Sequence, residues 1–294
     1  MDEQEWLADR FEEHRAHLRA VAYRMLGSVA EADDAVQDSW LRLSRSGAGD
    51  VENLGGWLTT IVARVCLNIL RSRNLRREES LGVHLPDPVI KTPEEEALLA
   101  DSVGLALLVV LDTLAPAERL AFVLHDMFQL PFEEIAPMVG RSPAAARQLA
   151  SRARRRVKGA EIPAPDPDLA RQRQVVDAFF LAARGGDFDA LVAVLDPDVV
   201  LRSDAGARRP AGSFVIRGAT AVARQSLRGL RSALAAALVR PALVNGAAGV
   251  VVTVGGRPLA VMGFTVTEGK IVEIDAIADP ERVPGIAAAL LTDE

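Results

Sequence analysis

Arginine is concentrated in two stretches of the sequence, where a run of positive charge could hold phosphate. Residues 141–158 contain seven basic side chains and no acid, and residues 64–77 contain five arginines and no acid. Acidic side chains gather elsewhere, at residues 31–38 and 94–96, and the whole chain has a formal net charge of -6. A net-acidic protein with two local basic stretches is expected to bind one polyanion and, through a separate surface, one basic partner.

Residue types that perform redox, metal or hydrolytic chemistry are sparse. The single cysteine, Cys66, cannot form an internal disulfide, which favours a reducing compartment. Of the four histidines, His14 and His17 lie three residues apart, with no cysteine or further histidine at a ligand-like spacing. We therefore expect a solvated helix face at this pair, no metal site and no bound cofactor.

Two proline-bearing stretches divide the 294 residues into three pieces. Residues 80–93 and 159–168 are predicted to be linkers, because proline and polar residues interrupt regular structure. They separate predicted domains at residues 1–79, 94–158 and 169–294, in keeping with the usual size of a domain. No run approaches the roughly 18 apolar residues of a membrane span, and the acidic start lacks a signal-peptide core. We expect a cytoplasmic protein that contacts no membrane.

The three pieces differ in their hydrophobic period. The first two have apolar residues at helical spacing over long stretches without glycine or proline, which predicts all-α domains. The third adds short β-branched runs to helical segments, with Glu268-Gly269 as a hairpin turn. The predicted strands are residues 199–201, 214–216, 250–254, 261–266 and 271–277. The fold class is therefore multidomain, with two all-α domains followed by an α+β domain.

Residues 31–43 have the pattern of an amphipathic helix. Its buried side is predicted to consist of Ala32, Ala35, Val36, Trp40 and Leu43. Its other side carries Asp34, Gln37, Asp38 and Leu41. Asp34 and Asp38 are four residues apart, so their repulsion costs a few tenths of a kcal/mol unless a basic group lies opposite. Taken alone, this surface fits either a solvated acidic face or the docking site of a basic partner.

A second helix is predicted over residues 57–73. The side chains expected to be buried are Leu58, Ile61, Val62, Val65 and Ile69. Its other side lines up Thr60, Arg64, Asn68 and Arg71. This stripe suits phosphates and base edges, and it fits a plain surface equally well. The predicted loop at residues 44–56, beside Trp57, could receive an unstacked base.

One segment predicts a helix-turn-helix. A short helix over residues 132–139 is followed by a turn at Gly140, and Ser142 is predicted to be an N-cap with Pro143 at the first helical position. The helix that follows is strongly basic, as expected of a recognition helix in a major groove; the alternative is a basic surface helix in a bundle. Pro137 is unfavourable in the first helix, because it removes a backbone hydrogen bond.

With these motifs the sequence resembles the bacterial extracytoplasmic-function (ECF) sigma factors, which direct RNA polymerase to promoters. The resemblance is carried in order by EADDAVQDSWL (31–41), GWLTTIVAR (56–64), LAPAER (114–119), FEEIA (132–136) and RAR (152–154). The first corresponds to the family's helix that binds core polymerase, the second to its minus-10 recognition segment, and the others to its minus-35-binding domain. In the family, a coiled coil of the polymerase binds the acidic helix and promoter DNA binds the arginine-rich stretches. The resemblance thus implies that the predicted basic partner is core RNA polymerase and the predicted polyanion is promoter DNA.

The resemblance also implies roles for individual residues. Core RNA polymerase would bind at Asp33, Asp34, Gln37, Asp38 and Leu41. The melted minus-10 element would contact Trp57, Thr60, Arg64, Asn68 and Arg71. The double-stranded minus-35 element would contact Ser142, Ala145, Arg147, Gln148, Ser151, Arg152 and Arg155.

Residues 169–294 resemble the SnoaL-like domain, a curved sheet with helices forming a cone, that is fused to some of these sigma factors. That subgroup's linker motif Trp-Leu-Pro-Glu-Pro is matched by HLPDP (84–88), its Asp-Gly-Gly-Gly-Lys motif by DAGAR (204–208) and its Asn-Pro-Asp-Lys-Leu motif by DPERV (279–283). Histidine thus replaces the tryptophan, and two of the three glycines are replaced. The implied interdomain regulatory residues are Leu85, Pro86, Asp87, Pro88, Asp204, Arg208, Asp279 and Pro280. We expect this domain to pack on the linker and the first domain and to regulate the protein in cis.

Two other classes of function stay open. A one-component regulator would use the helix-turn-helix alone, with a ligand-binding cone, and would need neither the acidic helix nor the Trp57 segment. An enzyme on a cone fold would need a carboxylate base in an apolar pocket, with a second acid, tyrosine or histidine. After His125 there is no histidine, the only tyrosine is Tyr23, and Asp275 on a predicted strand is expected to point outward. We therefore do not expect an enzyme, and a small-molecule ligand of the cone stays open.

Overall fold

A computed structural model describes residues 3–46, 53–77, 83–91, 104–160, 162–232 and 237–291 of the chain. The chain forms two compact units. The helical unit consists of Met1–Glu79 and Leu108–Glu161, and the sheet unit consists of Ser80–Leu107 and Ile162–Glu294. The acidic residues 94–96 lie outside the described residues. All-α segments followed by an α+β unit confirm the predicted fold class, whereas the finer division into three domains and two linkers stays a prediction.

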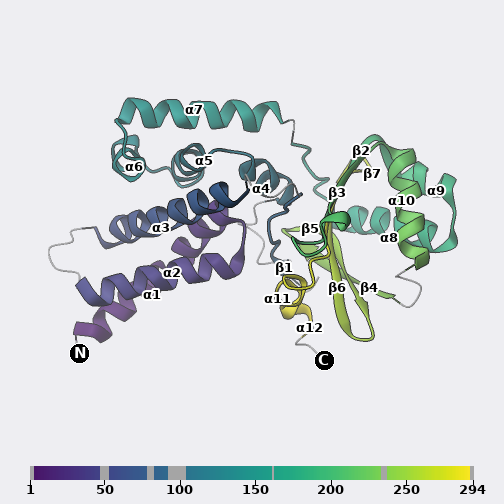
Figure 1. Ribbon diagram of the computed structural model, residues 1–294, viewed down its shortest axis with the longest axis horizontal. Helices are drawn as coiled ribbons and strands as arrows, with labels where there is room; N and C mark the ends of the chain where they lie inside the picture. Colours follow the sequence, from purple (N-terminus) through teal and green to yellow (C-terminus); the bar gives the residue numbers. More distant parts are fainter. Residues whose placement is uncertain are drawn as a thin grey trace. The chain divides into compact units, whose positions relative to one another are not determined.

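The helical unit contains the first segment that was predicted to be all-α and, from residue 108 on, the second (Figure 1). Its elements are α1 (Glu3–Leu26), α2 (Val29–Ser46), α3 (Leu54–Arg77), α4 (Leu105–Asp112), α5 (Pro116–Phe122), the π-helical turn η2 (Val123–Met127), α6 (Phe132–Val139) and α7 (Pro143–Gly159). Residues 105–107 of α4 belong to the sheet unit. Helices α1, α2 and α3 pack on one another, and Gly27, at φ 68°, turns the chain between the first two.

The predicted buried sides of α2 and α3 are largely confirmed. Four of the five predicted residues on α2 are buried, and the partly buried Trp40 has its ring centre 5.2 Å from that of Phe11. On α3 three predicted residues are buried, whereas Ile61 and Ile69 are only partly buried. The further buried residues of α3 are Thr59, Ala63, Cys66, Leu67 and Leu70. Helical period alone predicted too few buried residues on α3, because α3 also packs against α5 and α6.

The loop predicted before α3 is shorter than expected. Helix α2 continues to Ser46 and α3 begins at Leu54, while residues 47–52 lie outside the described residues. The early start of α3 has a local cause, because the side-chain oxygen of Asn53 accepts a hydrogen bond from the N–H of Gly56 at 2.9 Å. This is the contact of an N-cap residue, which satisfies a free backbone donor of the first turn.

One buried arginine joins the helices of the helical unit. Arg119 of α5 is 1% exposed. Its Nε donates to the carbonyl of Arg24 at 3.2 Å, and its Nη1 lies 3.1 Å from the carboxylate of Asp112. Burial raises the pKa of the Cys66 thiol to about 12, against the opposing charge of Arg119. This cysteine is therefore an inert thiol of the core.

The sheet unit is built on a seven-stranded sheet in the order β1-β4-β5-β6-β7-β2-β3. The strands are β1 (Ile90–Lys91), β2 (Leu195–Asp204), β3 (Phe214–Arg217), β4 (Ala237–Val244), β5 (Ala247–Val254), β6 (Arg257–Thr267) and β7 (Lys270–Ile277). Among the strands of the described residues, β2 and β7 run parallel and the other neighbours are antiparallel. The helical elements are α8 (Leu169–Gly185), α9 (Phe188–Val194), η3 (Pro210–Gly212), α10 (Ala219–Ser232), α11 (Val283–Ile286) and α12 (Ala288–Leu291).

Each of the five predicted strands is present, and the predicted hairpin turn is confirmed. Glu268 and Gly269 both have positive φ, 53° and 74°, as a two-residue turn between twisted strands requires. Two strands were not predicted. β4 contains Pro241 among alanines and leucines, which weakens a strand pattern, and β1 is only two residues long.

The two faces of the sheet differ in character. Helices α8, α9 and α10 cover one face (Figure 1), where Phe179, Phe180 and Phe264 pack with ring centres 5.3 to 5.9 Å apart. The inside of the cone is thus filled with apolar side chains. The opposite face carries Arg202 and Asp275. Over the described residues, no helix combines the length and hydropathy that a membrane crossing needs.

Candidate functional site

The acidic side of α2 is exposed. Asp33, Asp34, Gln37, Asp38 and Leu41 are all exposed, and Leu41 is a large apolar side chain at 41% exposure. Asp33 is engaged by Arg19 of α1, whose Nε lies 2.6 Å from the carboxylate. Glu31 lies at the other side of this cluster and pairs with Arg73 of α3. Asp34, Asp38 and the exposed Leu41 lie on the same helix, with Asp38 3.8 Å from Arg42, and this arrangement suits a partner with basic and apolar groups.

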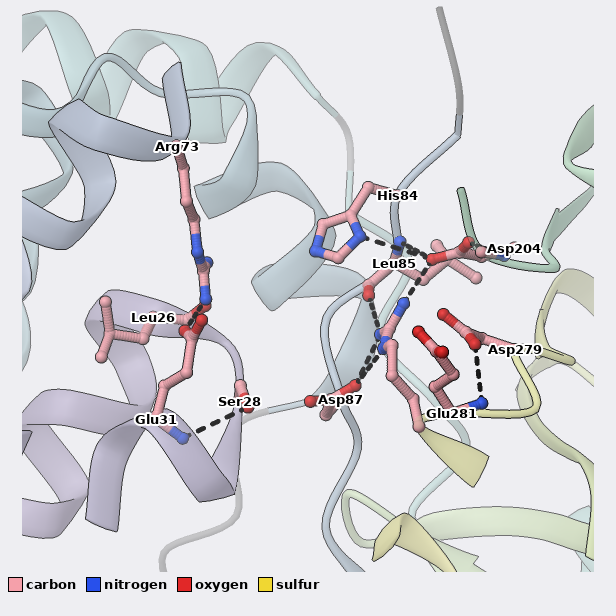
Figure 2. Close-up of polar contacts among 12 residues, drawn as sticks. Leu26, Ser28, Glu31, Arg73, His84, Leu85, Asp87, Asp204, Asp279 and Glu281 are labelled. Atoms are coloured by element: carbon pink, nitrogen blue, oxygen red, sulfur yellow. Dashed lines mark hydrogen bonds and ion pairs between the residues drawn. The ribbon is translucent and has the colours of Figure 1, made fainter. Parts of the chain in front are cut away.

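Arg73 of α3 contacts both the end of α1 and the start of α2. Its Nη1 donates to the carbonyl of Leu26 at 2.9 Å, while its guanidinium meets Glu31, as Figure 2 shows. The backbone N–H of Glu31 in turn donates a hydrogen bond to the hydroxyl oxygen of Ser28 at 3.5 Å. These contacts fix the acidic helix and the arginine-bearing helix in one orientation.

The predicted stripe on α3 is only partly exposed. Arg64, Asn68 and Arg71 are exposed, one turn apart from one another. Trp57 and Thr60 are partly buried, and the hydroxyl of Thr60 donates to the carbonyl of Gly56 at 2.9 Å. The exposed part of the stripe is therefore a polar, positively charged line that can donate hydrogen bonds to phosphates or bases.

The helix-turn-helix has the local geometry that its residues predict. Gly140 ends α6 with φ 65° and ψ 41°, a left-handed conformation that glycine adopts without strain. The hydroxyl of Ser142 accepts a hydrogen bond from the N–H of Ala145 at 3.3 Å, and Pro143 occupies the first turn of α7. Pro137 lies inside α6 despite its missing donor, on the exposed side of a helix whose buried side chains anchor it.

One side of α7 is exposed and the other packs on the helical unit. Ala146, Ala150 and Ala153 are buried. The predicted minus-35 residues that are exposed are Ser142, Arg147, Gln148, Ser151, Arg152 and Arg155, whereas Ala145 is partly buried. Small buried residues bring the backbone close to the core, so the long side chains on the opposite side project outward.

The arginines of α7 differ in their intramolecular contacts. Arg154 and Arg156 pair with Asp126 at 2.5 Å and Glu118 at 2.9 Å, and Arg152 lies 3.8 Å from Glu118. Within the described residues, Arg155 makes no such ion pair. The arginines of α7 therefore differ in role: Arg154 and Arg156 hold α7 on the helical unit, and Arg155 is exposed.

Residues 83–91, which lie in the predicted linker, belong to the sheet unit and are held in it by a buried polar cluster (Figure 2). Asp204, 2% exposed, accepts hydrogen bonds from the N–H of Leu85 at 2.9 Å and from Nη1 of Arg282 at 2.6 Å. Arg282 also donates to Asp87 at 2.7 Å and to the carbonyl of Leu85 at 2.5 Å. Nδ1 of His84 lies 3.5 Å from the Asp204 carboxylate. Arg282 and Asp204 thus form hydrogen bonds with the backbone of Leu85, and Arg282 also binds the side chain of Asp87.

The linker also extends the sheet. Its β1 pairs antiparallel with β4, with Ile90 opposite Val244. Just before it, the N–H of Val89 donates to the side chain of Asn245 at 2.7 Å, and the N–H of Asn245 donates to the carbonyl of Val89 at 2.9 Å. Backbone pairing of this kind depends little on side-chain identity, which is why no sequence pattern indicated it.

The eight predicted interdomain residues have different surroundings. Those that are buried or partly buried are Leu85, Pro86, Asp87, Pro88, Asp204 and Asp279. Pro280 is exposed, and the side chain of Arg208 is 79% exposed and pairs with Glu281 at 2.9 Å. Arg208 therefore forms an ion pair at the surface of the sheet unit. Arg282, which contacts Leu85 and Asp87, was not among the predicted residues. A signal for Arg282 existed, because it occupies the lysine position of the Asn-Pro-Asp-Lys-Leu motif.

The retained glycine of the 204–208 loop has a steric role. Gly206 has φ 78°, and a β-carbon at this position would overlap the carboxylate of Asp279. That carboxylate accepts the N–H of Glu281 at 2.9 Å, as drawn in Figure 2, which fixes the turn that follows β7. The loop is thus closely packed against the turn that carries Arg282.

Asp275 differs from its expected setting. It lies on the sheet face away from the helices, as predicted, but it is buried, at 3% exposure. Burial raises its pKa to about 6, with Glu273 adding to the rise and Arg202 opposing it. Arg202 lies between the two acids, 3.0 Å from Asp275 and 2.8 Å from Glu273.

Two family models match the helical segments of the chain. Sigma-70 region 2 matches residues 10–76, and Sigma-70, region 4 matches residues 104–157. These ranges contain the acidic helix, the arginine-bearing helix and the helix-turn-helix. A one-component regulator that uses a helix-turn-helix alone does not explain the first match, so the alternative function is set aside.

Similar proteins extend over nearly the whole chain. The ECF RNA polymerase sigma factor SigJ of Mycobacterium tuberculosis is 39% identical over 290 residues, which cover 94% of this chain and 92% of SigJ. The probable ECF RNA polymerase sigma factor SigI of the same species is 36% identical over 282 residues, covering 94% of each chain. A crystal structure of SigJ superimposes with a TM-score of 0.73 at 35% identity, covering 95% of this chain and 98% of that one. The chain therefore belongs to the extracytoplasmic-function family of RNA polymerase sigma factors.

Proposed function

We propose that this sigma factor binds core RNA polymerase through the exposed side of α2 and reads a bipartite promoter through α3 and α7. Core polymerase would meet Asp34, Asp38 and Leu41. The melted minus-10 element would lie along the exposed Arg64, Asn68 and Arg71, and the minus-35 element along the outer side of α7. The observation that carries this proposal is the exposure of an acidic, leucine-bearing side on α2 together with separate arginine-bearing sides on α3 and α7.

Charge reversal on α2 tests the polymerase contact. In the full chain, Asp34→Arg with Asp38→Arg is expected to abolish capture of core RNA polymerase in a pull-down. A matched control is Asp9→Arg with Glu13→Arg, because these acids of α1 are also exposed and four residues apart. Equal capture by both double variants would contradict the assignment of α2 as the polymerase-binding surface.

We further propose that the sheet unit regulates the sigma factor in cis through its grip on the linker. The linker precedes the segment that matches region 4, so its freedom sets how far the two DNA-binding segments can separate. The contacts that support this are those of Asp204 and Arg282 with Leu85 and Asp87. Cytoplasmic localisation and the absence of enzymatic activity are part of the same proposal, as expected of a transcription initiation factor.

Removal of one linker charge tests the regulation. Asp87→Asn loses one ion pair of Arg282 but leaves the pair with Asp204 intact, so the buried guanidinium of Arg282 stays paired. We expect a changed yield of promoter-specific transcript by core polymerase reconstituted with this variant. Arg208→Gln is the control, because this exposed arginine pairs with Glu281 and not with the linker. A transcript yield that stays at the wild-type level in Asp87→Asn would speak against cis regulation through this contact.

A further inference from the structure

The sheet unit has a cavity of about 460 Å³ on the face of the sheet opposite the helices. This volume falls within the range of small-molecule sites in proteins. Four chain segments line it, namely residues 104–107, 162–165, 244–247 and 263–265, together with Asp275. The cavity shares Phe264 with the apolar core under α8, α9 and α10, and none of its lining residues belongs to the polar cluster of Asp204 and Arg282.

The walls of the cavity are largely apolar. They include Leu105 and Leu107 of α4, the segment from Ile162 to Pro165, and Val244 at the end of β4. A ligand that fills this space must therefore bring apolar surface, whose transfer from water drives binding. Polar lining groups are few, and among them only Asp275 has an acidic side chain.

The charges around Asp275 are unbalanced. Arg202 is shared by Asp275 and Glu273, so two carboxylates face one guanidinium. Across the part of the chain that the structure describes, Oε2 of Glu273 is buried without a hydrogen-bond partner. A buried group of net charge -1 is costly, and one further positive charge would compensate it. Asp275 is the member of this trio that lines the cavity.

We propose that this cavity binds a small amphiphilic amine, whose ammonium group pairs with Asp275 and whose hydrocarbon part lies against the aliphatic wall. A neutral or anionic molecule of the same shape would leave the negative charge uncompensated. Residues 104–107 and 162–165 lead into and out of the segment 108–161, which contains the helix-turn-helix. A bound amine would therefore contact both connections of that segment. Any effect on transcription rests on the proposed function, but binding itself does not.

Calorimetric titration of the full chain at neutral pH tests this site with three probes: n-hexylamine, n-hexanol and n-hexanoate. We expect saturable binding of n-hexylamine, and affinities at least about tenfold lower for the other two, since the loss of a charge-assisted contact exceeds one factor of ten. Asp275→Asn should remove the preference for the amine. Asp177→Asn, an exposed acid of α8, is the matched control and should leave all three affinities unchanged.

A second variant keeps the test decisive if Asp275→Asn does not fold. Ala106→Phe places a large side chain at the cavity wall and should abolish binding of the amine while melting like the wild type. No saturable binding of n-hexylamine, equal binding of the three probes, or amine binding that survives both variants would each overturn the proposal. Because no polymerase enters this measurement, its failure would leave the proposed function of the sigma factor intact.

Discussion

The carboxylate of Asp204 accepts a hydrogen bond from the backbone N–H of Leu85 at 2.9 Å, although 119 positions of sequence separate the two residues. Burial by itself would raise the pKa of Asp204, but hydrogen bonds from His84, Leu85 and Gly206 and the charge of Arg282 hold it well below its usual range. A carboxyl with a lowered pKa stabilises the folded state above its ordinary pKa, and this stability is lost only as the pH falls through the lowered value. The linker contact therefore persists throughout the neutral and mildly acidic range.

Removing this carboxylate should free the linker. In Asp204→Ala, the N–H of Leu85 loses its acceptor, and Arg282 keeps Asp87 and the carbonyl of Leu85. We expect amide exchange over residues 83–91 to accelerate by about tenfold or more, because a hydrogen bond to a charged group contributes about 1.5–3 kcal/mol. Hydrogen exchange with mass spectrometry measures this. Asp189→Ala, at an exposed site on α9, is the control. Unchanged exchange at 83–91 in Asp204→Ala would show that the cluster does not hold the linker.

Asp275 should make the folded state less stable as the pH rises, the reverse of the effect of a carboxyl group whose pKa is lowered. Its pKa is raised to about 6 in the folded state, so between roughly pH 4 and 6 the folded chain binds more protons than the unfolded chain, and stability falls as the pH rises. Asp275→Asn leaves Arg202 paired with Glu273 and should raise the free energy of unfolding at neutral pH by on the order of 1–3 kcal/mol. Denaturant unfolding at several pH values checks this. The idea fails if the wild type and variant lose stability in parallel over this interval.

Substitutions of two neighbouring arginines of α7 should have different effects, one on DNA binding and the other on stability. Arg155→Gln is expected to weaken promoter binding by the holoenzyme and to lower the slope of log affinity against log salt by about one, because one phosphate contact is lost. Arg156→Gln instead removes the nearer of the two arginines beside Glu118 and should cost at most about 1 kcal/mol of stability. Fluorescence anisotropy and thermal melting measure the two effects. Arg184→Gln, on the exposed end of α8, serves as a control, and a salt slope that Arg155→Gln leaves unchanged would remove Arg155 from the DNA surface.

Gly206 should tolerate no side chain. Its φ of 78° costs an alanine about 1–2 kcal/mol, and the added β-carbon would overlap Asp279. Gly206→Ala is therefore expected to lower the melting temperature of the sheet unit and to loosen the linker contact. Gly185→Ala is a fitting control, because this helical glycine has open space around its β-carbon position. Similar melting temperatures for the two variants would mean that the loop is less tightly packed than the contact with Asp279 implies.

Local features of the helical unit could be predicted from sequence, because each is decided by residues close together in the chain. Gly140, Ser142 and Pro143 end one helix and begin the next through their own backbone preferences and one side-chain oxygen. The buried and exposed sides of α2 follow from helical period for the same reason. Resemblance to a family then assigned a function to these surfaces, which hydrophobic period alone left open.

The contacts between distant segments could not be predicted, because no local rule fixes which side chain meets which. Arg282 reaches Asp87 and Leu85 across the sheet unit, and β1 joins β4 through backbone groups that every sequence possesses. Asp275 has the sequence context of a surface strand residue, yet other segments of the sheet unit bury it. The sequence by itself determined the periodic helices, the turn from Gly140 to Pro143 and the hairpin of β6 and β7. Only the tertiary structure decided which charges are paired, buried or presented to a partner, because distant segments supply their neighbours.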